Sequence, residues 1–226
     1  VKDWKWEKWS LFDVHLALLN VPQFTAASAS KNPDLNKAFI YVVGFETEEN
    51  LIEHFKALKN GELKPSGFNC SFPTLLDPSE APAGRHTGLI SEHAPYRLKE
   101  GGPERWFKIR QEHAKGLIDK LRKYAPNMTW DNVIAANIDT PWDIMHRSDN
   151  FLEGNWGLIS GTPSQFGANR PIPEFAQYQI PGIEDFWMAS GSCHYSLGLT
   201  GWAGYNCYKR IAQKLNLWKP WEGRLF

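Results

Sequence analysis

The most informative stretch of this sequence for its fold and its ligand lies near the C-terminus: Met188-Ala-Ser-Gly-Ser-Cys-His-Tyr-Ser-Leu-Gly-Leu-Thr-Gly-Trp-Ala-Gly-Tyr-Asn-Cys207. A short apolar run, Phe186–Ala189, leads into it, Ser190–Gly201 is rich in glycine, and Gly204–Leu215 has helical spacing. This order predicts a strand, a glycine-rich turn and a helix. Such a unit directs backbone N–H groups and a helix N-terminus, with a partial charge of roughly +0.5, toward one point. That point favours an anion or an electron-rich carbonyl group of a cofactor.

The glycine spacing in this stretch is weak evidence on its own. Gly198-x-x-Gly201-x-x-Gly204 differs from the G-x-G-x-x-G dinucleotide fingerprint, which occurs nowhere in the sequence. From spacing alone, a structural turn and a ligand cradle both remain open.

Upstream of this stretch, the chain alternates between strand patterns and helix patterns. The longest helix is predicted over Glu104–Tyr124, Thr47 opens a shorter one, and Thr140 with Pro141 opens another. Asn150–Ile180 is rich in Gly, Pro and Asn and is predicted to be irregular. We therefore expect an α+β fold, with a mixed or antiparallel sheet and flanking helices. The predicted strands are Leu11–Leu19, Ala38–Phe45, Phe68–Leu76, His86–Ala94 and Val133–Ile138.

Composition excludes some classes of protein. Lys plus Arg and Asp plus Glu number 25 each, so the net charge is zero, which argues against nucleic-acid binding. The cysteines form no C-x-x-C pair, and their sparse, odd count of 3 suits a reducing compartment. No stretch reaches the ~18 apolar residues of a membrane-spanning helix.

We expect a cytoplasmic protein, with peripheral membrane contact as an open alternative. Because the sequence starts at Val1 rather than Met, we also expect a processed product, a fragment or a shortened chain.

Met188–Cys207 resembles the C-terminal flavin motif of the phytoene desaturase-like FAD oxidoreductases, whose usual form is roughly G-x-S-x-H-P-G-G-G-V-x-G-A-P-G-x-N-A-A. Other stretches resemble the family in the same order, and together they cover the chain from about Leu11 to Leu215. Several co-linear motifs are more specific than any single one. These stretches are Leu76-Asp-Pro-Ser-Glu-Ala-Pro-Ala-Gly-Arg-His86, Glu92-His-Ala-Pro-Tyr-Arg-Leu98, Tyr124-Ala-Pro-Asn-Met128, Thr140-Pro-Trp-Asp-Ile144 and Arg170-Pro171.

The resemblance implies that FAD is held by two pieces of protein. In the family, an N-terminal Rossmann unit binds the ADP half, and the C-terminal motif closes over the ribityl chain and the isoalloxazine. A substrate domain lies between them in the chain. This sequence lacks the Rossmann unit, so we expect that unit in a flavoprotein partner subunit or in a missing N-terminal half. We expect an aromatic, basic arm over residues 1–10, a substrate-binding domain over 11–180 and an FAD-contacting segment over 181–226.

The resemblance also assigns the FAD contacts residue by residue. The sequence departs from the family where Tyr195-Ser196-Leu197 replaces Pro-Gly-Gly and where Trp202-Ala203 replaces Ala-Pro. These bulkier groups predict either a reshaped substrate pocket or a site that no longer holds FAD. The implied contacts are Ser190, Gly191, His194, Gly198, Leu199, Thr200, Gly201, Trp202, Ala203 and Asn206.

Candidate catalytic residues each have a structural alternative. His194 is a candidate proton-transfer group or a backbone-bonded structural histidine. Tyr195 is a candidate acid and pocket residue or a core residue. His113, on the apolar stripe of the long helix, is predicted to be a satisfied core histidine. We predict no metal site, since the His and Asp residues lack metal-ligand spacing. The predicted substrate-pocket residues are His93, Tyr96, Tyr195 and Trp202.

Two hypotheses follow for the function. The first is a subunit or C-terminal portion of an FAD-dependent dehydrogenase or desaturase. It would act at an allylic position of an apolar, isoprenoid-like or terpene substrate, by desaturation or hydroxylation, with hydride transfer to flavin. The second is a non-catalytic accessory subunit that binds an apolar ligand or scaffolds a flavoprotein partner.

Overall fold

The computed structural model describes residues 4–64, 67–194 and 200–223. Its internal contacts divide the chain into two compact units. The sheet unit is Lys8–Trp156, and the C-terminal unit combines Val1–Glu7 with Gly157–Phe226. The functional division into an arm, a substrate-binding domain and an FAD-contacting segment stays a prediction.

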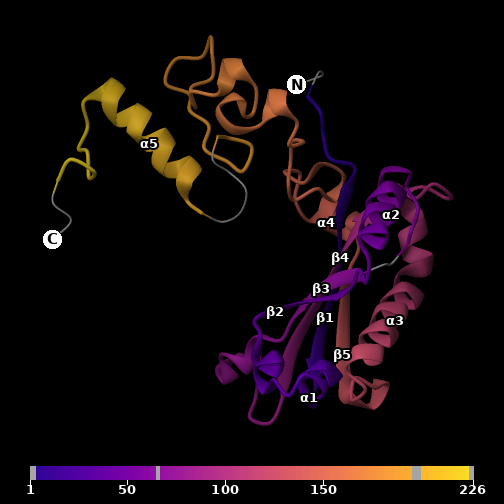
Figure 1. Ribbon diagram of the computed structural model, residues 1–226. Coiled ribbons are helices and arrows are strands. Elements are labelled where there is room, and N and C mark those ends of the chain that lie inside the picture. Colours follow the sequence, from indigo (N-terminus) through magenta and orange to yellow (C-terminus); the bar gives the residue numbers. More distant parts are fainter. Residues whose placement is uncertain (1–3, 65–66, 195–199, 224–226) are drawn as a thin grey trace. The chain divides into compact units, whose positions relative to one another are not determined.

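The sheet unit is built on a five-stranded sheet with the order β2-β3-β4-β1-β5 (Figure 1). All neighbouring strands are antiparallel, which confirms the expected α+β class and the antiparallel sheet. The strand predicted to reach Leu76 ends at Ser71 instead, because Pro73 opens a 3₁₀ turn and proline cannot donate to a ladder. The strands are β1 (Trp9–Leu18), β2 (Ile40–Gly44), β3 (Gly67–Ser71), β4 (His86–Pro95) and β5 (Val133–Asp139).

One face of this sheet forms the main core. Along β1 the alternate residues Phe12, Val14 and Leu16 are buried, as the period of two along a strand requires. Helix α3 (Trp106–Tyr124) runs alongside the strands (Figure 1), and its Trp106 ring lies 5.3 Å from the Phe12 ring. The periodicity of α3 was therefore a reliable guide to its buried stripe.

Shorter helices complete the sheet unit. Helix α2 (Glu48–Lys59) begins after Thr47, whose hydroxyl accepts the Asn50 N–H. Helix α1 (Thr25–Ala29) was missed in the sequence, because five residues without a side-chain cap carry no helical period. The 3₁₀ segments described are Pro33–Lys37, Pro73–Leu75, Pro78–Glu80, Pro103–Arg105, Trp130–Asn132, Leu152–Gly154, Pro163–Gln165, Gly167–Asn169 and Pro173–Phe175.

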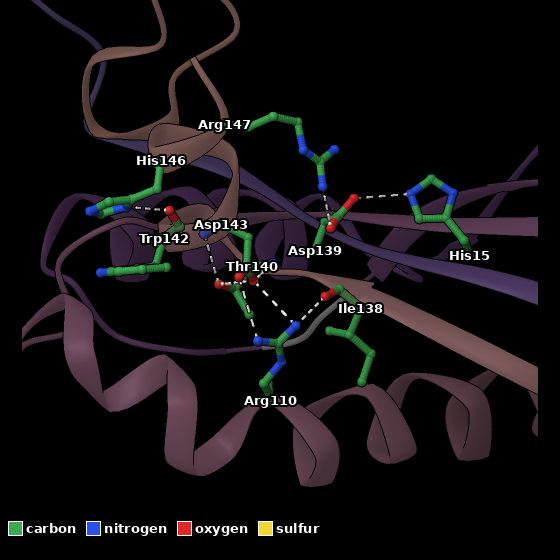
Figure 2. A network of polar contacts seen from close by, with 9 residues as sticks. All are labelled: His15, Arg110, Ile138, Asp139, Thr140, Trp142, Asp143, His146 and Arg147. Carbon is green, nitrogen blue, oxygen red and sulfur yellow. Dashed lines mark hydrogen bonds and ion pairs between the residues drawn. The ribbon is translucent and has the colours of Figure 1, made fainter. Parts of the chain in front are cut away.

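Helix α4 (Pro141–Arg147) has the predicted cap. Thr140 and Asp143 form a reciprocal capping box, with the Thr140 N–H donating to the Asp143 carboxylate at 2.8 Å (Figure 2). Arg110 of α3 donates to the Ile138 carbonyl and lies 3.3 Å from the same carboxylate. These contacts fix the start of α4 against α3 and the end of β5.

The C-terminal unit has little regular structure apart from its last helix. The strand predicted over Phe186–Ala189 is absent, and a single bridge pairs Gln179 with Trp187. A four-residue apolar run without a neighbouring ladder cannot extend this bridge. Helix α5 (Trp202–Leu215) starts slightly earlier than the predicted Gly204. No described helix is long and apolar enough to cross a bilayer.

Candidate functional site

The N-terminus of α5 has little packed against it among the residues that the structure describes. Gly201 precedes it at φ +72°, a left-handed conformation that favours glycine. No side chain caps the first turn strongly, and the nearest hydroxyl, on Thr200, lies 3.5 Å from the Trp202 nitrogen. A Cβ added at Gly201 or Gly204 would meet no atom of the described residues within 4 Å. Among the described residues, this first turn has no strong side-chain cap and open space beside Gly201 and Gly204, an arrangement that suits an anionic or carbonyl oxygen of a cofactor.

The turn before α5 is held by a buried arginine. Arg170 is only 2% exposed, and burial lowers the pKa of its guanidinium. It donates to the Gly191 carbonyl at 3.1 Å, to Ile159 at 3.3 Å and to Gly157 at 3.1 Å. Arg170 thus links three backbone segments of this unit, and it holds the predicted contact Gly191 in place.

A polar cavity of about 480 Å³ lies beside α5. It brings together two of the predicted residues, His194 and Asn206. The sequence did not predict the other cationic and polar residues that line the cavity. A signal for them was present, because positions 206, 209, 210 and 213 have the three-to-four-residue spacing of one helix face. No acidic side chain lines it among the described residues. The lining is Ala168, Ala176, Gln177, Tyr178, His194, Asn206, Lys209, Arg210 and Gln213.

Tyr178 forms a rigid wall of this cavity. It is buried, and its φ of +69° is unusual for a residue other than glycine. Its hydroxyl donates to the His194 carbonyl at 3.3 Å. Burial raises the pKa of the Tyr178 phenol, so the phenol stays a hydrogen-bond donor at neutral pH. The wall can orient a polar group but offers no strong base.

The other predicted FAD contacts are dispersed. Trp202 is 52% exposed, whereas Ala203 packs on the small cluster of Tyr178, Cys193 and Cys207. Ser190 accepts the Ser192 N–H at 3.1 Å within its own turn. Tyr195, Gly198 and Leu199 lie outside the described residues.

The predicted substrate residues of the sheet unit have structural contacts. The His93 ring packs edge-on against Trp9 at 4.7 Å, and burial lowers the pKa of His93. Tyr96 is buried, with the Arg97 guanidinium 5.5 Å from its ring centre. Their role toward a substrate stays a prediction.

His113 is confirmed as a satisfied core histidine. Its Nε2 lies 2.6 Å from Oε2 of the buried Glu92. Within residues 4–64, 67–194 and 200–223, no group of His, Cys, Asp or Glu side chains is arranged to hold a metal ion.

The fold and the site define a mixed α+β protein with an open helix N-terminus beside a polar, cationic cavity. No family model matches the chain. The chain is similar to a limonene dehydrogenase subunit of Castellaniella defragrans (strain DSM 12143 / CCUG 39792 / 65Phen), with 29% identity over 223 residues. The match covers 96% of this chain and 40% of that protein, so the chain spans less than half the length of the relative.

Proposed function

We propose that this chain is part of an oxidoreductase that acts on a terpene-like, apolar substrate. The observation that carries the proposal is the similarity to the limonene dehydrogenase subunit along 96% of the chain. The name of that relative supports both a dehydrogenase and an assembly of more than one subunit.

We further propose that the cofactor is FAD and that a Rossmann-containing partner, or a missing N-terminal half, holds its ADP portion. When bound, the flavin supplies a two-electron acceptor for a hydride. The residues of this chain that would hold it are Gly201, the amides of Trp202 and Ala203, and Asn206. The open N-terminus of α5 and the lack of a strong cap support this assignment.

Exposed apolar side chains around α5 support a missing partner. Trp202 and Tyr205 lie on the helix, and Leu217 and the 76% exposed Trp218 follow it. Large exposed aromatic groups are enriched where proteins meet. The chain would then contribute orientation and exclusion of water, since the cofactor carries the redox chemistry.

The reaction we propose is dehydrogenation, desaturation or hydroxylation at an allylic position. His194 is the proposed proton-transfer group in the C-terminal unit, together with Tyr195. His93 and Tyr96 are proposed substrate contacts of the sheet unit.

A non-catalytic accessory subunit is the second candidate. The observation that favours it is the indole of Trp202, which stands in the first turn of α5 where the related flavin motif has a small residue. If this group blocks the cofactor, the chain would bind an apolar ligand or scaffold its partner.

Two glycines provide a matched test, because both lie in helices and neither has a packing neighbour among the described residues. A Cβ at Gly204 in α5 or at Gly116 in α3 would meet nothing within 4 Å. Gly→Ala in a helix stabilises by roughly 0.5–1 kcal/mol. We therefore expect Gly204→Ala and Gly116→Ala to stabilise the chain to a similar extent in urea unfolding.

The two variants should differ in flavin content. In the complex purified with its partner, Gly204→Ala should lower the flavin absorbance per protein, because a methyl group then stands where the cofactor approaches the backbone. Gly116→Ala should leave it unchanged. Full flavin content in both variants would argue against contact at α5 and would favour the accessory role.

A further inference from the structure

The sheet has a second face, opposite α3, where polar residues of four strands stand in one row. The register pairs Asn69 of β3 with Ser91 of β4, Ser91 with Asp13 of β1, and Asp13 with Asp139 of β5. Ser91 donates its hydroxyl proton to the Asp13 carboxylate at 2.5 Å. Polar side chains in one cross-strand row can act on a single ligand, because directly opposite residues are roughly 5 Å apart.

Asp139 is the anchored member of this row. Its side chain is only 10% exposed and is held at 2.7 Å by Nη2 of Arg147, from α4 (Figure 2). Its other oxygen faces Nε2 of His15 at 3.4 Å (Figure 2). A carboxylate in this position stabilises a proton on Nε2, and it leaves Nδ1 as the acceptor nitrogen.

His15 presents that acceptor nitrogen away from the core. Its side chain is 51% exposed, and Nδ1 has no hydrogen-bond partner among the described residues. Its cross-strand neighbours are Leu89 and Asn137. Ile40 and Val42 are exposed on the same face, but they lie on the edge strand β2, which β3 and β4 separate from β1. An oriented histidine in partly apolar surroundings can bind and deprotonate a hydroxyl group.

His113 shows what a purely structural histidine looks like in this fold. It lies on the opposite, covered face, where Glu92 pairs with it, and its side chain is only 10% exposed. A core histidine needs no exposed acceptor nitrogen. The two histidine–carboxylate pairs thus differ in access to solvent, and also in distance, which is 2.6 Å for His113 and Glu92 and 3.4 Å for His15 and Asp139.

We propose that His15 and Asp139 form a proton-transfer site that takes the hydroxyl group of an otherwise apolar ligand. The ligand donates its O–H hydrogen bond to Nδ1 of His15. When the proton moves, the O–H bond breaks, an N–H bond forms, and the electron pair stays on the ligand oxygen. Asp139 stabilises the resulting imidazolium, and Asp13 with Ser91 provides a second polar contact. The apolar ligand class rests on the proposed function.

The charged surroundings of Asp13 are consistent with a site that handles protons. Burial raises the pKa of Asp13, while Ser91, His15 and Arg147 lower it and Asp139 raises it. Asp13 therefore holds a proton to a higher pH than an exposed aspartate does.

The direct test is ¹⁵N NMR of the histidine rings in the full 226-residue chain, with 2-cyclohexen-1-ol as the probe. Cyclohexene, which lacks only the hydroxyl group, is the matched control. We expect His15 in the Nε2–H form, with an Nδ1 shift that moves with the alcohol and not with cyclohexene. His113 should not respond to either compound and serves as the internal check on folding. An insensitive His15, or an equal response to cyclohexene, overturns the proposal.

Asp139→Asn separates positioning from folding. An amide N–H pointing at Nε2 should favour the Nδ1–H form, so the response of His15 to the alcohol should be lost while His113 keeps its signals. An unchanged tautomer and response in Asp139→Asn also overturns the proposal. If that variant unfolds, Arg147→Met is the second test. Removing the Arg147 contact should loosen Asp139 and lower the ratio of the Nε2–H to the Nδ1–H form of His15 at least several-fold.

The NMR result is independent of the cofactor. Absence of flavin in the purified complex would contradict the proposed function but would leave the His15 response to the alcohol as a separate result. In a flavin-loaded complex, His15→Gln should lower turnover at least ten-fold with the flavin content unchanged. Unchanged turnover there would contradict a role of the site in the reaction.

Discussion

The sheet unit and the C-terminal unit are stabilised by different kinds of interaction. In the sheet unit, apolar side chains of five strands and α3 form one continuous core that includes Phe12, Ile90 and Trp106. In the C-terminal unit the apolar cluster centres on Tyr178, Cys193 and Cys207. Buried polar groups, chiefly Arg170 and Gln165, connect the remaining loops by hydrogen bonds to backbone carbonyls.

This difference indicates that the sheet unit is the better candidate for folding on its own. Burial of apolar area is the main stabilising term of a domain, so the sheet unit has the features of an independent fold. The C-terminal unit depends on a few directional contacts and leaves aromatic groups of α5 exposed. Segments of low local stability are those that order on binding a ligand or partner. If the proposed function is right, the C-terminal unit gains much of its order from the proposed cofactor and partner.

The largest expected effect is in the core of the sheet unit. Trp106 is fully buried, and its Nε1 donates to the Pro95 carbonyl at 3.2 Å. Trp106→Ala should cost about 3–5 kcal/mol in urea unfolding because it leaves a large cavity. Trp202→Ala, on the exposed side of α5, should change stability by less than about 0.5 kcal/mol. Equal losses in the two variants would remove the contrast between the units.

A smaller, local effect is expected at Arg170. Arg170→Met leaves three carbonyl groups without their donor and should cost about 2–4 kcal/mol, confined to the C-terminal unit. Hydrogen exchange should therefore speed up over residues 157–194 and stay unchanged in the strands. The control is Arg97→Met, which removes an exposed ion pair with Glu153 and should cost less than about 0.5 kcal/mol. Faster exchange throughout the chain would show that the two units unfold together.

The smallest effect is a pH dependence within the sheet unit. Burial raises the pKa of Asp13, so the folded state binds this proton more tightly than the unfolded state does. Ionised Asp13 therefore disfavours folding. The free energy of unfolding falls as the pH rises from the unfolded pKa of Asp13, near 3.8, through its higher folded pKa. Asp13→Asn should stabilise the chain by less than about 1 kcal/mol at pH 7, and this gain should vanish below the unfolded pKa. A gain that persists in acid would assign the effect to packing instead.

Sequence periodicity was sufficient for the longer regular elements of the sheet unit, although it missed the short helix α1 and placed the end of β3 too late. The alternation along β1, the apolar stripe of α3 and the Thr140 cap of α4 each depend on near neighbours in the chain. The short run Phe186–Ala189 was wrong as a strand, because strand formation needs a partner ladder that the sequence does not reveal.

The candidate sites were harder to predict, for a similar reason. Asn206 and His194 were named by resemblance, but their cavity also needs the loop that carries Gln177 and Tyr178. The pair of His15 and Asp139 joins β1 to β5, which are more than a hundred residues apart in the sequence. Only the register of the sheet brings these two residues together.

The central claim is that this chain supplies part of a flavin site that a partner completes. The most direct measurement is the visible absorbance of flavin in the complex that copurifies with the 226-residue chain, compared with the same complex carrying Gly201→Trp. We predict that a chain with a G-x-G-x-x-G motif copurifies, that the complex contains bound flavin, and that Gly201→Trp removes most of it. A partner-free monomer, or flavin content unchanged by Gly201→Trp, would contradict the claim.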